Sequence, residues 1–206
     1  GKSTTIKHII GTLLPDSGEV TLQGVTLAQN MEKYRSSFSY IPETPVLYDE
    51  LTLEEHIALT GMAYGLDEKT VKERADKLLK EFRMERRLKW FPSHFSKGMR
   101  QKVMIMCAFL VEPSLYILDE PFVGLDPLGI QSLLGQTAEK KKDCAAILMS
   151  THILSTAERY CDRIILLHEG RVRAQGTMAD LRQAFNMPEA TLDDLYIAMT
   201  KEQDHA

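Results

Sequence analysis

The sequence predicts an α/β fold built on a mostly parallel sheet, and two observations predict it. From Pro113 onward, segments typical of strands and helices alternate, with strands over residues 115–118 and 145–150 and helices over 130–141 and 153–160. Both strand segments are almost continuously apolar, which is typical of a parallel sheet covered on both faces. The length of 206 residues, with 44% apolar and 26% charged residues, is that of a globular protein.

The first part of the chain is predicted to form a helix and two strands. Apolar residues at helical spacing predict a helix from the first residues to the breaker at residues 15–18. Residues 19–23, which precede Gly24, are a short strand candidate. Residues 38–41 are a second strand candidate, and Pro42 ends it.

Helices dominate the middle of the chain. Thr52 and Glu55 have the capping-box spacing, which predicts a helix that runs toward Tyr64. Apolar positions within residues 71–82 mark a second, amphipathic helix. A strongly apolar helix follows Ser96.

The last part of the chain is predicted to contain a hairpin and two short helices. Residues 163–167 and 171–175 are joined through a Glu-Gly turn and are expected to form a hairpin at the edge of the sheet. Capped helices are expected from Thr177 and Thr191.

Composition excludes several classes of protein. The formal net charge is −4 and the pI is near 5.9, which argues against sequence-independent binding to nucleic acid phosphates. The longest apolar run, residues 103–111, is about half the length that a bilayer requires. The three cysteines, Cys107, Cys144 and Cys161, are not spaced as a disulfide or zinc framework.

Candidate chemistry begins at the first residues. Gly1-Lys2-Ser3 matches the last three positions of the phosphate-binding motif G-x-x-x-x-G-K-[ST], and a predicted helix follows at once. In such a loop the backbone N–H groups surround phosphates, the lysine reaches the terminal phosphates and the hydroxyl binds Mg²⁺.

Two carboxylates, Asp119 and Glu120, directly follow an apolar strand. Ligands of open α/β sheets bind at the carboxyl ends of strands. There, one carboxylate can hold Mg²⁺ while the other orients and deprotonates a water that attacks a phosphoryl group. His152 follows the next predicted strand and is expected at the same edge, although a lone histidine there is more often structural.

Ser96 and Gly98 precede the apolar helix, where free N–H groups favour an anion. Taken alone, an ordinary serine N-cap is the better interpretation. Residues 124–127, Gly-Leu-Asp-Pro, are on their own a turn.

Together and in this order, the motifs resemble those of the ATP-binding subunit of ABC transporters, over the chain to about Thr177. Residues 1–4 look like the end of the Walker A motif and residues 115–120 like Walker B. Residues 95–99 look like the family signature, residues 124–126 like the D-loop and His152 like the switch histidine.

The resemblance implies a P-loop NTPase-like fold with an inserted helical subdomain and the edge hairpin. It implies ATP and Mg²⁺ as cofactors. The implied site residues are Glu120 and His152 for catalysis, Ser3, Glu43 and Asp119 around the metal, and Gly1, Lys2, Ser3, Thr4, Glu43, Ser96, Gly98 and Asp126 for nucleotide binding.

Two departures from the usual family motifs point to one branch of the family. Lys97 and Met99 replace a glycine and the glutamine of the usual signature, and Glu43 stands where glutamine is commoner. Both departures resemble the exporter-type, ABC-2-like branch. Residues 40–48, 94–99 and 158–162 are similar to the Ecs-type transporters of Gram-positive bacteria.

The expected organisation is one ABC ATPase domain over residues 1–206 that lacks its N-terminal strands. Residues 1–50 and 93–176 form its core, residues 51–92 its helical subdomain and residues 177–206 a short helical tail. The chain is expected to be truncated within Walker A, which would remove most of the phosphate loop. This form is therefore expected to bind ATP poorly.

The resemblance also implies partners and a location. The expected partners are a separate membrane permease subunit, served in the export direction, and a second copy on ATP binding, with no nucleic acid. The expected location is cytoplasmic, peripheral to the inner face of the cell membrane. The loop of residues 44–50 is a candidate contact for the permease, although Val46 and Leu47 could instead pack beneath it.

Two other classes of function compete with a transporter subunit. A soluble ABC ATPase could act on DNA or ribosomes, but only 52 residues separate Glu43 from Ser96, which leaves no room for long coiled coils. The basic run over residues 72–89 is interspersed with acidic residues, as on a solvated helix face. A non-enzymatic remnant is disfavoured because the downstream catalytic positions carry competent residues.

Overall fold

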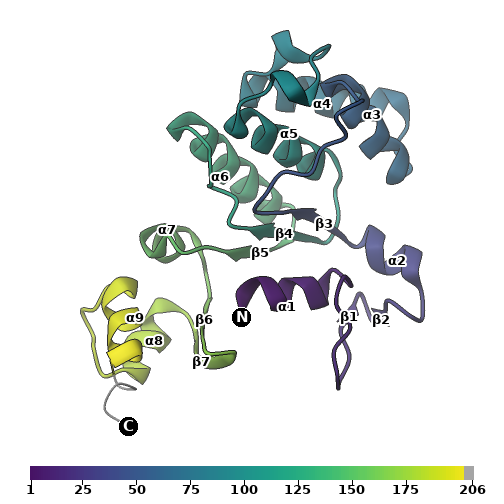
Figure 1. Ribbon diagram of the computed structural model, residues 1–206. Coiled ribbons are helices and arrows are strands. Elements are labelled where there is room, and N and C mark those ends of the chain that lie inside the picture. Colours follow the sequence, from purple (N-terminus) through teal and green to yellow (C-terminus); the bar gives the residue numbers. More distant parts are fainter. Residues whose placement is uncertain (202–206) are drawn as a thin grey trace. The chain divides into compact units, whose positions relative to one another are not determined.

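The computed structural model describes residues 1–201 and contains two compact units (Figure 1). The larger unit comprises residues 8–150, and the smaller one comprises residues 1–7 together with the chain from Thr151 onward. Residues 202–206 of the expected tail lie outside the described residues.

A three-stranded parallel sheet lies at the base of the larger unit, in the order β3 (Phe38–Ile41), β4 (Leu115–Asp119) and β5 (Ala146–Ser150). The predicted α/β class is therefore confirmed, and each strand lies within one residue of its expected bounds. The register pairs Ile41 with Leu118 and Asp119 with Ser150. The carboxyl ends of all three strands thus meet at one edge of the sheet.

Helices α5 (Lys97–Leu110) and α6 (Pro127–Lys142) lie over one face of this sheet, and α3 (Leu53–Ala63) and α4 (Glu68–Phe82) pack against α5 (Figure 1). Two short 3₁₀ helices, η1 (Glu85–Arg87) and η2 (Pro92–His94), connect α4 to α5.

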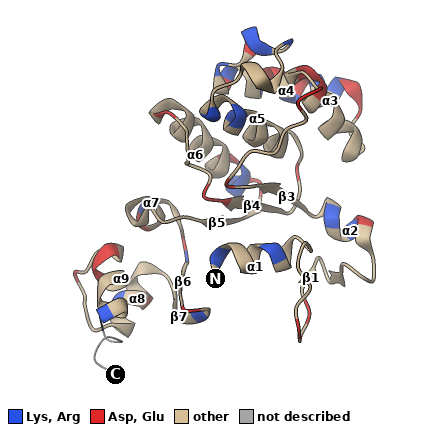
Figure 2. Cartoon of the chain, viewed as in Figure 1, with Lys and Arg blue, Asp and Glu red and all other residues tan. Residues whose placement is uncertain are grey.

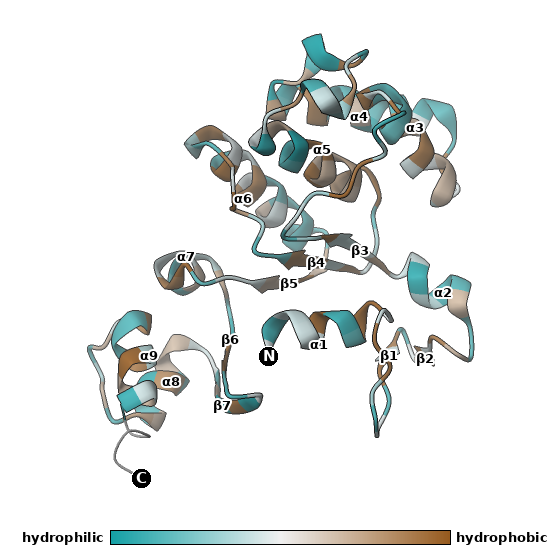
Figure 3. Cartoon of the chain, viewed as in Figure 1, coloured by the Kyte–Doolittle hydropathy of each residue, from teal (hydrophilic) through white to brown (hydrophobic). Residues whose placement is uncertain are grey.

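Helices α3 and α5 begin where the sequence predicts, whereas α4 and α6 each begin three residues before their predicted ranges. Thr52 forms the full capping box with Glu55, and the side chains of Asp67 and Ser96 accept hydrogen bonds from N–H groups in the first turns of α4 and α5. Apolar side chains of the sheet and helices then merge into one cluster, and the strands are coloured as hydrophobic in Figure 3. Its most buried members, each at most 1% exposed, are Ile41, Leu53, Phe82, Val103, Ile105, Met106, Leu110, Tyr116, Leu118 and Leu133.

The structure corrects the prediction for the first forty residues. Helix α1 (Lys2–Ile9) ends before Leu13, at a turn in which Gly11 has a φ of +76°. The predicted strand over residues 19–23 is only β1 (Thr21–Leu22), paired antiparallel with β2 (Val25–Thr26). Gln23 and Gly24 have positive φ angles, as the two-residue turn of a hairpin requires.

Helix α2 (Met31–Ser36) was not expected from the sequence. It begins at Asn30, whose side chain accepts a hydrogen bond from the Lys33 N–H at 2.9 Å. Six residues are too few for a clear helical periodicity, so this cap was the available signal.

The smaller unit contains α7 (Leu154–Tyr160), the strands β6 (Ile164–His168) and β7 (Arg171–Gly176), α8 (Met178–Ala184) and α9 (Leu192–Lys201). The predicted hairpin is confirmed, but among the described residues β6 and β7 form a two-stranded sheet of their own rather than an edge of the parallel sheet. Its apolar cluster includes Ile164, Leu166, Leu181, Leu192, Leu195 and Met199.

Within residues 1–201, no helix combines the length and the apolar character needed to cross a bilayer.

Thiol chemistry offers a test of the packing around α5. Burial raises the pKa of the Cys107 thiol to about 11, so only about 0.1% of it is thiolate at pH 8, whereas Cys144 is exposed. We expect iodoacetamide at pH 8 to modify Cys144 well before Cys107 in the native protein. Mass spectrometry of peptides measures both rates, with urea-unfolded protein as the control. Equal native rates would contradict this packing.

Candidate functional site

Asp119 and Glu120 lie at the carboxyl end of β4, and their exposed fractions are only 5% and 9%. The Ser150 hydroxyl, at the end of β5, donates a hydrogen bond to Asp119 Oδ1. The backbone N–H of Glu120 donates to the Ser150 carbonyl at 3.1 Å. The ends of the two strands are therefore tied together, and both predicted carboxylates are held at this edge.

Glu120 has a φ of +46°, the left-handed region that residues other than glycine seldom adopt. Such a conformation costs about 1–3 kcal/mol and persists only where the surrounding structure enforces it. Here the two strand ends enforce it, immediately after the last residue of β4. Strain of this kind is concentrated at functional sites.

Glu43 belongs to the same edge. It is exposed and follows β3 by two residues. Burial, and then the negative charges of Asp119 and Glu43, raise the pKa of the Tyr40 hydroxyl. Both carboxylates therefore act on one side chain of β3, as expected for groups at one sheet edge.

The oxygen-rich edge fits Mg²⁺ bound together with phosphates. Among the described residues, no group of three or more His, Cys, Asp or Glu side chains could hold a metal on its own. Mg²⁺ needs no such cage, because it is usually held by one or two carboxylates and the phosphates of a substrate. Asp119 supplies one such carboxylate.

Ser96 and Gly98 lie in the first turn of α5. Ser96 is exposed, and its hydroxyl oxygen accepts a hydrogen bond from the Met99 N–H at 3.3 Å. A Cβ on Gly98 would lie 2.4 Å from the carbonyl oxygen of Gly124, so only glycine fits there. The signature-like turn thus packs directly on the turn that follows Glu120.

Asp126 has a structural role within the larger unit. Its carboxylate caps α6 by accepting from the Gly129 N–H at 2.8 Å, and it pairs with Lys102 Nζ at 3.2 Å. The hydrogen bond from Gly129 and then the Lys102 ammonium hold the pKa of this carboxyl below its usual value. A contact between Asp126 and nucleotide stays a prediction.

The other predicted residues belong to the smaller unit. Residues 1–4 lie at the start of α1, where the backbone and hydroxyl of Thr5 each donate to the Gly1 carbonyl at 3.0 Å. His152 lies between β5 and α7. The structure thus brings together Glu43, Asp119 and Glu120, and separately packs Gly98 on Gly124. That Lys2, Ser3 and His152 join them stays a prediction.

Comparison with protein families assigns the chain to one of them. The family model described as "ABC transporter" matches residues 1–123. The chain belongs to the ABC transporter family. It is an ABC ATPase with a P-loop NTPase fold, and ATP hydrolysis is its activity.

Individual members of the ABC transporter family support the same assignment. The ABC-type transporter ATP-binding protein EcsA of Bacillus subtilis is 65% identical over 98% of this chain and 82% of its own length. A solved structure of an ATP-binding subunit of an ABC transporter superposes with a TM-score of 0.95 at 60% identity, over 97% of this chain and 83% of that one. The resemblance to Ecs-type ATPases is therefore confirmed.

The cbiO1 protein of Clostridium perfringens, part of the ABC transporter complex cbiONQ, is more distant. It is 27% identical, with a TM-score of 0.71, over 90% of this chain and 75% of that one.

Sequence reasoning missed three residues that the structure places beside this ABC ATPase site. Ser150 binds Asp119, Gln101 contacts the residue after Glu120, and Lys102 pairs with Asp126. Ser150 carried a signal, since it ends a strand that neighbours the carboxylates. Gln101 and Lys102 lie within an apolar helix and carried none beyond their polarity.

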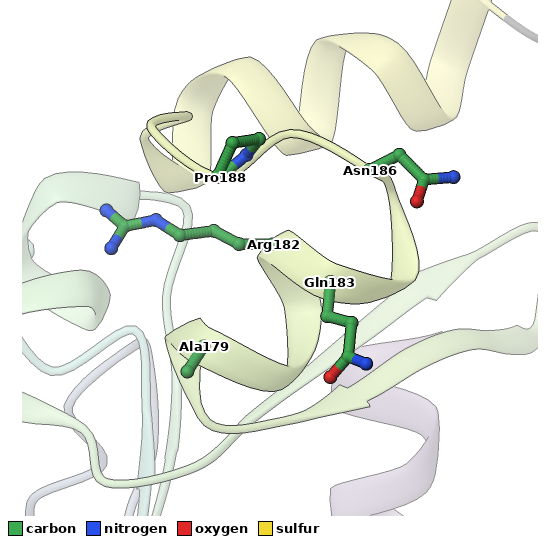
Figure 4. A pocket seen from close by; sticks show the side chains of 5 residues that line it. All are labelled: Ala179, Arg182, Gln183, Asn186 and Pro188. Atoms are coloured by element: carbon green, nitrogen blue, oxygen red, sulfur yellow. The ribbon is translucent and has the colours of Figure 1, made fainter.

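A hollow of about 510 Å³ in the smaller unit contains none of the predicted site residues (Figure 4). It is lined by Ala179, Arg182, Gln183, Asn186 and Pro188. Arg182 donates to the Ala190 carbonyl and pairs with Glu158, which ties α8 to its neighbours.

Proposed function

We propose that this ABC ATPase hydrolyses Mg²⁺-ATP to drive a separate membrane permease in the export direction. The observation that carries the proposal is the buried Asp119–Glu120 pair at the carboxyl end of β4. The departures of Lys97 and Glu43 from the usual motifs support the exporter branch. By its title, cbiO1 is part of a transporter complex, which supports a permease partner. The protein then acts at the cytoplasmic face of the membrane.

The proposed residue roles follow from chemistry. Asp119, Glu43 and Ser3 supply oxygen ligands for Mg²⁺, and the ion when bound offsets the negative charge of the phosphates. Gly1, Lys2, Ser3 and Thr4 bind phosphates at the start of α1, where N–H groups and the helix dipole favour anions.

Glu120 acts as the general base. Its carboxylate accepts a proton from water as the water oxygen bonds to the γ-phosphorus, and the bond from that phosphorus to the bridging oxygen breaks to leave ADP. The His152 imidazole stabilises the negative charge that develops on the γ-phosphate. The buried location of Glu120 limits competition from bulk water.

A second copy completes the site in this proposal. Ser96, exposed at the N-terminus of α5, and Gly98 contact the γ-phosphate bound by the partner copy. Asp126 lies close to the same interface. Because ADP lacks this phosphate, the dimer is stable only before hydrolysis.

The dimer can be tested by light scattering of the full-length protein that carries Glu120→Gln. We expect a dimer with saturating Mg²⁺-ATP and a monomer with ADP. Ser96→Arg should leave only the monomer, because a long cation would fill the phosphate contact. Ser93→Arg, which adds the same charge at an exposed position three residues earlier, should leave the dimer intact. A dimer that survives Ser96→Arg would contradict this role.

The loop over residues 44–50 is proposed as the permease contact. Val46 and Tyr48 are 75% and 62% exposed, whereas Leu47 packs against the core. The sequence left open whether these residues pack beneath the loop or lie on its surface. Leu47 packs beneath the loop, and Val46 lies on the surface. Exposed apolar groups in a fixed loop suit docking of a short helix.

The loop is held by contacts on both sides of Tyr48. His56 Nδ1 donates to the Thr52 carbonyl at 2.8 Å, so the ring is the Nδ1–H tautomer and Nε2 accepts from the Tyr48 N–H at 3.0 Å. Asp49 pairs with Arg100 at 2.9 Å. Such a loop loses little conformational entropy when a partner binds.

The basic run over residues 72–89 supports the permease over a nucleic acid partner. Acidic residues at 73, 76, 81 and 85 are interspersed with the basic ones, and Figure 2 shows the charges of this part of the chain. Arg74 pairs with Glu112, Lys89 pairs with Glu54, and the Arg87 guanidinium lies 4.2 Å from the centre of the Trp90 ring. These three cations contact groups of the same chain, which favours a structural surface over a site that binds nucleic acid phosphates.

A further inference from the structure

The segment from Glu120 to Asp126 is held against α5 at three points. The side-chain N–H of Gln101 donates to the Pro121 carbonyl at 3.5 Å. The Gly124 carbonyl touches the position of a Gly98 Cβ, and Lys102 pairs with Asp126. We call this set of contacts the α5 clamp. It joins the first two turns of α5 to the residues that directly follow the catalytic carboxylate.

The two side chains of the α5 clamp are deeply buried. Gln101 is 0% exposed and Lys102 is 9% exposed, although both are polar. Burial of an ammonium group is costly unless it is paired, and Asp126 supplies the pair. Gln101 Oε1 is buried and finds no hydrogen-bond partner among the described residues. Among the described residues, the polar contact that its amide makes is therefore the one to the Pro121 carbonyl, next to Glu120.

The α5 clamp contacts the chain directly after Glu120, whose backbone conformation is strained. Glu120 has a left-handed backbone that its surroundings must enforce. Ser150 fixes the N–H side of Glu120, and Gln101 contacts the carbonyl of the following residue. A displacement of about 1 Å can lower a rate about 100-fold. The contacts of Ser150 and Gln101 therefore affect how accurately the Glu120 carboxylate is placed against the attacking water.

We propose that Gln101 and Lys102 are positioning residues for Glu120, and that the α5 clamp couples the Ser96–Gly98 turn to that carboxylate within one chain. This inference rests on the proposed role of Glu120 as the general base. When the turn binds a γ-phosphate, any shift of α5 is passed through Pro121, Gly124 and Asp126 to Glu120. Neither Gln101 nor Lys102 needs to touch the nucleotide.

The test uses the full-length protein with Mg²⁺-ATP. We expect Gln101→Leu and Lys102→Met each to lower kcat about 10-fold or more, while the KM for ATP and ATP-dependent dimerisation stay within about twofold. Lys102→Arg, which keeps the cation, should restore most of the rate. Because partial unfolding lowers the amount of active protein, it would also lower the apparent kcat at an unchanged KM, so kcat is expressed per folded molecule.

Lys140 provides a matched control. Like Lys102 it is 9% exposed, and it pairs with Glu112 at 3.1 Å, but it belongs to the last turn of α6. Lys140→Met should lower the melting temperature about as much as Lys102→Met and leave kcat per folded molecule unchanged. If both lysine variants lower kcat equally, the inference is overturned.

The outcomes separate this inference from the function on which it rests. If Glu120→Gln in the same preparation keeps its turnover, the proposed general base is wrong. If Glu120→Gln loses turnover while Gln101→Leu and Lys102→Met keep theirs, only the positioning role fails. If Gln101→Leu does not fold, the comparison of Lys102→Met with Lys102→Arg still decides.

Discussion

Replacement of Glu120 by glutamine is expected to lower the turnover of ATP about 10²- to 10⁴-fold, equivalent to about 2.7–5.5 kcal/mol of activation free energy. The amide has the shape of the carboxylate but cannot accept the proton of the attacking water. Glutamine adds no volume to the buried site and tolerates the same backbone φ about as well as glutamate. The nucleotide affinity should therefore stay within a fewfold of the wild-type value.

Single-turnover hydrolysis and equilibrium nucleotide binding measure these two quantities separately in the full-length protein. Glu139→Gln, an equivalent change at an exposed position of α6, is the control and should leave both quantities unchanged. If the Glu120 variant hydrolysed ATP within a fewfold of wild type, another group would have to be the base. A parallel loss of affinity would instead indicate a role in binding.

The parallel sheet was predictable because its signal is local. Strands β3 and β4 are short apolar runs that a proline and an acidic pair end, and these features lie in consecutive residues. The β1–β2 hairpin was less accessible. Its turn requires positive φ at Gln23 as well as at Gly24, and glutamine gives no such indication. Two-residue strands also leave no alternation to detect.

In the candidate site, too, the residues with a local sequence signal could be predicted and those that depend on tertiary packing could not. Asp119 and Glu120 could be predicted because the end of an apolar strand is visible in the sequence. The contact of Ser150 with Asp119 depends on the register between β4 and β5, which no local pattern specifies. Likewise, the choice between Val46 and Leu47 as the buried residue depends on where the core lies beneath the loop.

Val46→Asp combined with Tyr48→Ala is expected to weaken binding of the permease about 100-fold or more, so that the two proteins no longer copurify. A carboxylate at the centre of an apolar contact loses its hydration without gaining a partner, and the alanine removes most of the exposed aromatic surface. The backbone N–H of Tyr48 remains, so the hydrogen bond to His56 and the shape of the loop are kept. Leu47 is left unchanged because it packs against the core.

Copurification from membranes that contain the full-length transporter measures this effect, and the basal ATPase activity of the isolated subunit should stay within about twofold of wild type. Leu14→Asp is the matched control, since Leu14 is 81% exposed and lies outside the loop. Retention of the permease by the double variant would place the interface elsewhere on the protein. Copurification of the wild-type protein with ribosomes or DNA in place of a membrane protein would favour a soluble ABC ATPase. Loss of the permease by the double variant alone would assign residues 44–50 to the contact through which ATP hydrolysis drives transport.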